Sequence, residues 1–260
     1  MTAQLTLKFQ HKLPGDVWKT CLSTTDGSIG IEVRNHQSKK VYFFKIDSRG
    51  ELHSFANQMA FSWWITIAGL SEKHLILEKM NDPLNTEDRN LYVYHWQNGQ
   101  LLWSKDGLIY QQHDENRLEA ILKTDDSVEN VAFDLASGKQ EVEQYSIVRR
   151  NKDFVEPTQF QEGTDDFDKI AEFILIELNV KARLVVDYVE AGGKMLLSYY
   201  VADKKGFSNF IGVWNEKGDC ILLELMEKEL KLSAQSSFFV LEKDVIVVQE
   251  KVKVKGYQLS

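Results

Sequence analysis

The chain has 260 residues, of which 43% are hydrophobic, 11% aromatic and 27% charged, and its formal net charge is −8. This composition is typical of a globular protein with a sizeable core, and an acidic chain with dispersed basic residues lacks the electrostatic footprint of a nucleic-acid-binding protein. No apolar run approaches the roughly 20 residues of a membrane-spanning helix. We therefore expect neither a nucleic-acid partner nor a membrane partner.

The chain opens with an alternating stretch, QLTLKFQHK from Gln4 to Lys12, that predicts a β-strand. The remaining predicted strands form four groups of four and a last group of three: Val17 to Phe55, Trp63 to Ser104, Leu108 to Gln144 or beyond, Arg183 to Met226, and Ser236 to Leu259. The last group is one strand short. The N-terminal strand can supply the missing one.

Each group of four contains a β-hairpin with a polar turn that ends in glycine. The clearest is LYVYHWQNGQLLWSK, from Leu91 to Lys105, in which side chains alternate between two faces and Asn98-Gly99 predicts a type I′ turn. The turn glycines are Gly50, Gly99, Gly138 and Gly218, so the steps are 99−50=49, 138−99=39 and 218−138=80 residues. A period of about 40 to 50 residues, with the last step double, is typical of the four-stranded blades of a β-propeller.

These hairpins resemble the repeats of quinoprotein-type (PQQ-like) β-propellers, which combine a strand, an Asp, a small residue and a Gly with a second strand that carries Trp. Asp134 to Gly138 keeps the Asp and the Gly, and Trp103 keeps the Trp. The resemblance covers the outer half of each blade and implies a propeller scaffold. Quinoprotein enzymes use larger rings, a metal and a secreted setting, so we expect no cofactor and no metal here.

We predict an all-β fold, a five-bladed β-propeller in which the N-terminal strand closes the last blade and so removes the free sheet edges. Only three prolines are present and no linker is rich in Ser, Gly or Pro. We therefore predict one domain over residues 1–260.

An insertion from about Val148 to Lys181 interrupts the strand pattern. Thr164 is a candidate N-cap, acidic residues follow it, and apolar residues recur at three- and four-residue spacing. We predict a docked helix near Asp165 to Leu178. The alternative is that Phe173 to Leu178 forms a strand.

Signatures of chemistry are scarce. The six histidines stand singly, without the spacing of a zinc site, and the sequence has no nucleophile elbow, Walker loop or dinucleotide-binding motif. Cys21 and Cys220 lie in apolar segments, which predicts free, buried thiols and a cytoplasmic protein.

The leading hypothesis is a monomeric, non-enzymatic scaffold that binds a protein or a small-molecule ligand. The alternative is a glycoside hydrolase-like enzyme, because two carboxylates that face each other across a channel mouth would suit that reaction. The candidate carboxylates are Asp16, Asp106, Asp114 and Asp187.

Four aromatic residues begin inner strands and are candidates to anchor a ligand, or else to fill the space between blades: Trp18, Trp63, Trp64 and Tyr110. In an antiparallel meander the glycine turns mark one face, and longer connections such as Asn81 to Arg89 reach the other. We predict that the helix rims the channel mouth on that second face, beside Trp63 or Trp64. Arg149 and Arg150 are predicted anion contacts there.

Overall fold

The computed structural model describes residues 5–82, 84–123, 127–141, 154–233 and 238–259. Most of these residues form strands, arranged in five antiparallel sheets, and the described part of the chain contains one α-helix. The prediction of an all-β chain is confirmed. The chain divides into two compact units, Pro14–Asn151 and Met1–Leu13 with Lys152–Ser260, which we describe separately. That both belong to one domain stays a prediction.

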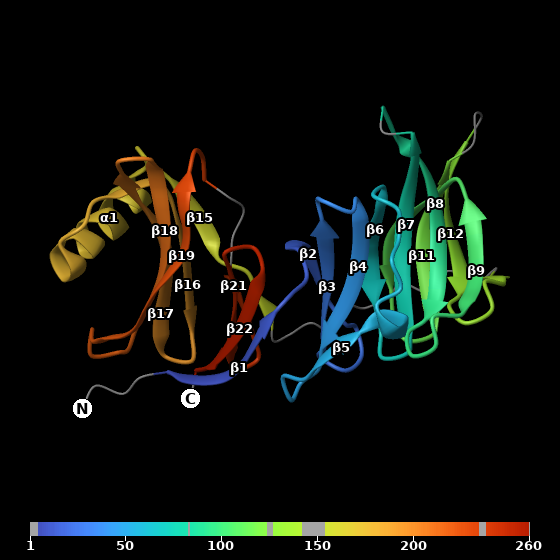
Figure 1. Cartoon of the computed structure of the whole chain (residues 1–260), viewed down its shortest axis with the longest axis horizontal. Helices are drawn as coiled ribbons and strands as arrows, with labels where there is room; N and C mark the ends of the chain where they lie inside the picture. The colour runs from blue at the N-terminus through green and yellow to red at the C-terminus, as the bar shows by residue number, and fades with distance from the viewer. Residues whose placement is uncertain (1–4, 83, 124–126, 142–153, 234–237, 260) are drawn as a thin grey trace. The chain divides into compact units, whose positions relative to one another are not determined.

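The unit Pro14–Asn151 holds three four-stranded sheets (Figure 1), and within each sheet the strands pair in chain order, as predicted. The first sheet contains β2 (Asp16–Leu22), β3 (Ile29–Asn35), β4 (Lys40–Ile46) and β5 (Leu52–Ser54), followed by the 3-10 turn η1 (Phe55–Asn57). The second contains β6 (Ile65–Leu70), β7 (His74–Asp82), β8 (Asn85–His95) and β9 (Leu101–Asp106). The third contains β10 (Leu108–His113), β11 (Arg117–Lys123), β12 (Val128–Asp134) and β13 (Gln140–Glu141).

These three sheets pack face to face. Alternation along β7 sends Leu75 and Leu77 into a core shared with Phe43 of the first sheet. Ile76, between them, enters a second core shared with Phe133 of the third sheet. The second sheet is therefore buried on both faces, which explains why its strands carry near-continuous apolar runs.

All four predicted hairpins are present, at β4–β5, β8–β9, β12–β13 and, in the other unit, β18 (Gly206–Trp214) with β19 (Cys220–Leu230). The four turn glycines have positive φ, from 67° at Gly138 to 87° at Gly50. The type I′ prediction for Asn98-Gly99 is wrong. Only Gly99 has positive φ, and its N–H donates to the carbonyl of His95 at 3.0 Å across a longer loop.

The long loop predicted at Asn81 to Arg89 is also wrong, because β7 and β8 continue through this segment. Asp82 pairs with Asn85, and Met80 pairs with Arg89. Asn81 Nδ2 donates to the side-chain oxygens of Asp88 and Asn90, each at 2.8 Å. Polar contacts between the strands thus extend this hairpin beyond the apolar pattern from which its length was predicted.

The unit of Met1–Leu13 and Lys152–Ser260 holds two five-stranded sheets. One contains β15 (Thr158–Gln161), β16 (Ala182–Ala191), β17 (Lys194–Asp203), β18 and β19. The other contains, in spatial order, β1 (Thr6–Lys12), β22 (Lys253–Gln258), β21 (Asp244–Gln249), β20 (Phe238–Leu241) and β14 (Phe154–Val155). The N-terminal strand therefore joins the last sheet through β22, whereas the blade count and the closure of a ring stay predictions.

The insertion contributes two short strands that the sequence did not indicate. β14 pairs with β20, and β15 pairs with β16, so each adds a fifth strand to one of the two sheets. The sheets also pack face to face, with Leu196 and Val213 of one against Val245 and Val247 of the other. The expectation that the insertion lacks strands is therefore wrong for this part of it.

The helix α1 spans Asp165–Leu178, so the helix prediction is confirmed and the strand alternative for Phe173 to Leu178 is wrong. The Oγ1 atom of Thr164 accepts the N–H of Phe167 at 3.3 Å. Three aspartates occupy the first turn, where the positive end of the helix dipole favours negative charge. Local capping signals therefore determine where this helix begins.

The apolar stripe of α1 packs on the face of the sheet formed by β15–β19 (Figure 1). Phe167 and Ile174 are buried against Val186 and Trp214. The prediction that the helix lies at the rim of a channel mouth is therefore wrong. An apolar stripe of this width buries more area against the face of a sheet than against the ends of strands. The predicted neighbours Trp63 and Trp64 belong to the other unit, so their proximity to the helix stays a prediction.

Both cysteines are free thiols, as predicted, but they are partly exposed, which corrects the prediction of full burial. Cys21 packs against the core between the first two sheets of its unit. Burial of the sulfur raises the pKa of Cys21 to about 12, and burial also raises the pKa of Cys220. Since the thiolate is the nucleophile, both side chains are in the unreactive form at neutral pH.

We therefore expect neither thiol to react with an aromatic disulfide reagent at pH 8 until denaturant is added. At that pH the thiolate fraction of Cys21 is about one in ten thousand, compared with roughly one in four for an ordinary cysteine. The absorbance of the released reagent measures the reaction, and the protein in denaturant provides the positive control. Stoichiometric labelling of either residue within seconds in buffer would contradict the burial argument.

Candidate ligand-binding surface

A cluster of two tryptophans and an arginine lies at one end of the first two sheets of the unit Pro14–Asn151. Trp18 is near the start of β2, Arg34 is near the end of β3, and Trp63 lies two residues before β6. The Arg34 Cζ atom is 4.5 Å from the centroid of the Trp18 ring and 5.0 Å from that of Trp63. The guanidinium therefore makes cation–π contacts with both indoles. We call these three residues the Trp–Arg cluster.

A buried carboxylate fixes the arginine of this cluster. Glu32 is 0% exposed, and its Oε1 atom accepts the Nε–H of Arg34 at 2.7 Å. Its other oxygen, Oε2, accepts the hydroxyl of Thr66 at 2.6 Å and the backbone N–H of Ile67 at 3.0 Å. Both carboxylate oxygens are therefore satisfied, and one side chain joins the first sheet to the second.

Arg34 is only 8% exposed, but its terminal nitrogens keep some contact with solvent. Within the described residues neither Nη1 nor Nη2 has a hydrogen-bond partner, and neither is a fully buried atom. Since the Nε–H and both ring contacts hold the guanidinium in place, these two nitrogens form a preorganised pair of donors. Such a pair suits a carboxylate or another planar acceptor.

The surroundings of the cluster add positive charge and aromatic surface. The Nζ atom of Lys39 lies 5.0 Å from the centroid of the Trp63 ring. The ring of His36 contacts Trp63 edge-on at 5.1 Å, and its Nε2 atom is 3.4 Å from Asp16 Oδ2. Trp18 is 56% exposed, so one indole of the cluster remains available to a ligand.

The structure thus brings together two of the predicted site residues, Trp18 and Trp63. Trp64 is 44% exposed but takes no part in the ring contacts of the cluster. Tyr110 serves a structural role, since its hydroxyl contacts His113 Nδ1 at 2.7 Å and its N–H donates to Glu78 at 2.8 Å. The last two predicted contacts, Arg149 and Arg150, lie outside the described residues.

Sequence reasoning missed Arg34, Glu32 and Lys39. A signal was present in β3, where alternation places Glu32 and Arg34 on one face and Ile31 and Val33 on the other. Two opposite charges on one face of an otherwise buried strand indicate that the two side chains form an ion pair, with either a structural or a binding role. The partner rings could not be identified this way, because they come from other strands.

The carboxylates considered for glycoside hydrolysis have separate local environments. Asp114 accepts the N–H groups of Asn116 and Arg117 in a turn, and Asp106 is exposed. Asp187 belongs to the other unit, where it is 1% exposed and accepts the amide of Gln159 at 2.9 Å. Asp114 thus caps a turn, and Asp187 packs within its own unit.

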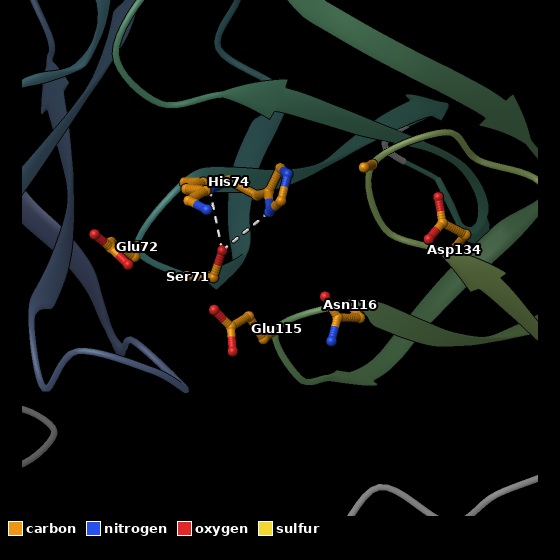
Figure 2. Close-up of a pocket in the computed structure, with 8 residues that line it drawn as sticks. Ser71, Glu72, His74, Glu115, Asn116 and Asp134 are labelled. Carbon is orange, nitrogen blue, oxygen red and sulfur yellow. Dashed lines mark hydrogen bonds between the residues drawn. The ribbon is translucent and has the colours of Figure 1, made fainter.

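A pocket of about 220 Å³ lies between the second and third sheets (Figure 2). It is lined by polar residues of the β6–β7, β10–β11 and β12–β13 turns: Glu72, Lys73, His74, Glu115, Asn116 and Asp134. Trp63 precedes β6 and Glu72 follows it, so the pocket and the Trp–Arg cluster lie at opposite ends of this strand. The sequence assigned no site to the end with the glycine turns.

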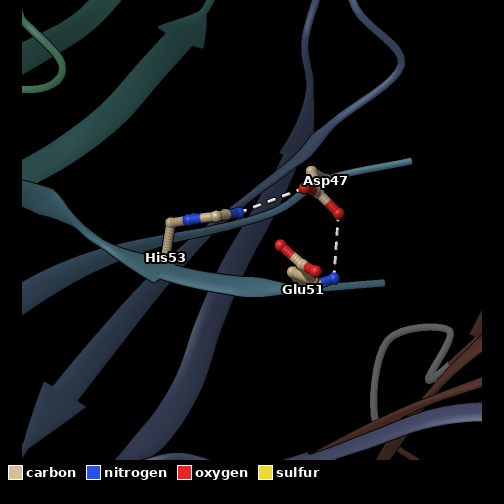
Figure 3. A group of neighbouring side chains, drawn as sticks. All are labelled: Asp47, Glu51 and His53. Atoms are coloured by element: carbon tan, nitrogen blue, oxygen red, sulfur yellow. Dashed lines mark hydrogen bonds and ion pairs between the residues drawn. The ribbon is translucent and has the colours of Figure 1, made fainter. Parts of the chain in front are cut away.

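Asp47, Glu51 and His53 of the β4–β5 hairpin place three metal-ligand atoms within 4.8 Å of one another (Figure 3). Arg49 already pairs with this group, through Nη2 contacts of 3.1 Å to Asp47 and 3.0 Å to Glu51. Burial opposes ionisation of Asp47, but hydrogen bonds from the Glu51 N–H, His53 and Arg49 outweigh it and lower the pKa to about 2. The arrangement is explained as a charged turn, and we assign no metal to it.

Comparison with known proteins gives one family match, a "Domain of unknown function (DUF4905)", over residues 22–103. This segment includes Arg34, Lys39 and Trp63 but covers less than half of the chain. The resemblance to PQQ-like repeats gains no support from it. No curated protein sequence matches the chain.

Solved structures with similar chains share little sequence with this protein. The uncharacterized protein lmo1340 from Listeria monocytogenes EGD-e is 9% identical, with a TM-score of 0.39, and the match covers 96% of this chain and 98% of that one. The β-propeller domain of the Trilobed protease from Pyrococcus furiosus is 8% identical, with a TM-score of 0.35 and coverage of 94% and 81%. In the described part of the chain, no helix has the length and apolarity needed to cross a bilayer.

Proposed function

We propose that this chain is a five-bladed β-propeller that binds a protein or small-molecule ligand at the Trp–Arg cluster and catalyses no reaction. Two features support this fold: the five sheets, and the strand β1 that joins the last of them. In this proposal the protein is cytoplasmic and monomeric, and the ring serves as a rigid scaffold for the binding surface.

The observation that carries the proposal is that an exposed indole lies beside a fixed guanidinium whose terminal nitrogens are not paired. Trp18 exposes 56% of its surface while it stacks on Arg34, whose terminal nitrogens lack protein partners among the described residues. Tryptophan and arginine are enriched among the few interface residues that contribute most of the free energy of binding. A ligand with a flat apolar group and a neighbouring carboxylate would use both side chains.

An enzymatic function would need a group with a suitable proton affinity. Among the described residues, each carboxyl group whose pKa is clearly shifted has a lowered pKa: Asp26, Asp47, Asp134, Asp203 and Glu250. A general acid of a glycosidase requires a raised one. No observation therefore favours the hydrolase alternative.

We expect Trp18→Ala to weaken ligand binding at least tenfold, which corresponds to about 1.4 kcal/mol. Native mass spectrometry of the full-length protein with a small-molecule library, and of complexes purified from cells, identifies the ligand. Titration calorimetry then compares the variants.

Trp64→Ala is the matched control, because it removes an indole of similar exposure that lies outside the cluster. It should bind as the unmodified protein does. Equal losses in the two variants, or no loss in Trp18→Ala, would rule out the cluster as the binding site. Turnover of any identified ligand would contradict the non-enzymatic assignment.

A further inference from the structure

The pocket between the second and third sheets has an excess of negative charge. Glu72, Glu115 and Asp134 line it together with one cation, Lys73. Within the described residues none of these three carboxylates forms an ion pair, although carboxylates elsewhere in the chain do so repeatedly. Three unpaired carboxylates around one pocket produce a field that attracts a cation.

Asp134 is held in the ionised form. Its Oδ1 atom accepts the hydroxyl of Ser137 at 2.5 Å and the N–H of Ser137 at 2.8 Å, and these bonds lower the pKa of Asp134. The backbone N–H of Ala136 also lowers the pKa of this carboxylate, and Asp134 lines the pocket. This carboxylate can therefore accept a hydrogen bond from a ligand.

A buried histidine supplies the second, independent observation. His74 is 8% exposed and lines the pocket, and its Nδ1 atom contacts the hydroxyl of Ser71 at 3.2 Å (Figure 2). The Nε2 atom has no hydrogen-bond partner among the described residues, and it is not a fully enclosed atom. His74 is thus largely buried, but its Nε2 atom can still reach solvent or a ligand group that satisfies it.

The chemistry of His74 suits a donor ligand. Burial lowers the pKa of His74, the nearby His95 and Lys73 act in the same direction, and Asp134 opposes them; the net shift is downward, which favours the neutral ring at pH 7. When Nδ1 carries the proton and donates a hydrogen bond to Ser71 Oγ, Nε2 is an acceptor. A ligand N–H at Nε2 selects this tautomer, while its positive charge is balanced by the carboxylates.

We propose that this pocket binds a small organic cation, an ammonium or guanidinium group, between His74, Glu115 and Asp134. A single metal ion fits less well, because these groups do not gather three ligand atoms within metal-ligand range, unlike Asp47, Glu51 and His53. A volume of about 220 Å³ is large enough for a small amine or one basic side chain. The site is separate from the Trp–Arg cluster, so neither proposal depends on the other.

The test uses the full-length protein and the imidazole C–H signals of His74 in NMR spectra, assigned with a His74→Gln variant. We expect methylguanidinium or ethylammonium chloride to shift these signals saturably, whereas sodium acetate and sodium chloride at the same ionic strength leave them in place. The affinity for acetylated, amidated arginine is then compared with the affinity for a peptide that has arginine at its centre. Tighter binding of the peptide indicates a basic side chain of a partner, and tighter binding of the single residue indicates a free small molecule.

Glu115→Gln removes one carboxylate from an exposed turn residue and should weaken cation binding about tenfold, since a charge-assisted hydrogen bond becomes a neutral one. Glu172→Gln, an exposed position on α1, makes the same charge change in the other unit and should leave binding unchanged. The absence of a saturable shift up to about 100 mM cation, well above the 1 mM scale of weak ligands, would overturn the proposal. Equal effects of the two substitutions, or a stronger response to acetate, would overturn it as well.

Discussion

Replacing Glu32 with alanine is expected to lower the free energy of unfolding by about 3–5 kcal/mol, a large fraction of the stability of a domain. The side chain is 0% exposed and accepts hydrogen bonds from Arg34, Thr66 and Ile67. Its removal leaves a buried guanidinium without its counter-charge and a backbone N–H without an acceptor. Urea unfolding followed by tryptophan fluorescence measures the change.

Two further variants separate the causes. Glu32→Gln keeps an acceptor for the Ile67 N–H but removes the charge that pairs with Arg34, so we expect an intermediate loss. Glu129→Ala, an exposed carboxylate on β12 of the same unit, should change stability by less than about 0.5 kcal/mol. A Glu32→Ala protein with the unfolding midpoint of the unmodified chain would show that the inter-sheet contact is not stabilising.

Deleting residues 1–13 should destabilise the unit of Met1–Leu13 and Lys152–Ser260 by several kcal/mol, out of the roughly 5–15 available to a domain. β1 pairs with β22 from Thr6–Gln258 to Lys12–Lys253, and the Phe9 ring packs so close to Gly256 that a Cβ there would lie 2.3 Å from it. The deletion exposes the β22 edge to solvent and to other chains. We expect a lower melting temperature in calorimetry and association in size-exclusion chromatography.

A chain that lacks only residues 1–4 keeps all of β1 and serves as the control. A synthetic peptide of residues 4–13, added in excess to the deleted protein, should restore part of the melting temperature by pairing with β22. An unchanged melting temperature together with a monomeric elution volume would contradict the role of this strand.

Local patterns determined much of the fold. The four hairpins follow from alternation that ends in a turn glycine, since only glycine enters positive φ at no steric cost. The helix boundaries follow from Thr164, which caps the first turn, and from Asn179, which ends the helix in the left-handed conformation. The N-terminal strand was assigned to the last sheet by counting strands, because a group of three lacked its partner.

Other features depend on partners that are distant in the sequence. The two-residue strand β14 exists because its backbone meets β20, and its own sequence has no period to detect. Likewise, the sequence of α1 indicated an apolar stripe. Where this stripe is buried depends on the apolar face of β16–β18.

The same distinction applies to the candidate sites. The sequence indicated that Trp18 and Trp63 lie at the start of inner strands. The arginine that joins them is defined only by its distances of 4.5 Å and 5.0 Å to the two rings. The pocket is formed by turns about 20 to 60 residues apart, and its charge excess arises from carboxylates that individually resemble ordinary turn residues. The sequence alone determined most of the strands, the positions of the glycine turns and the helix, because those depend on neighbours a few residues away. Tertiary structure decided which charges and rings meet, because that depends on how the sheets pack.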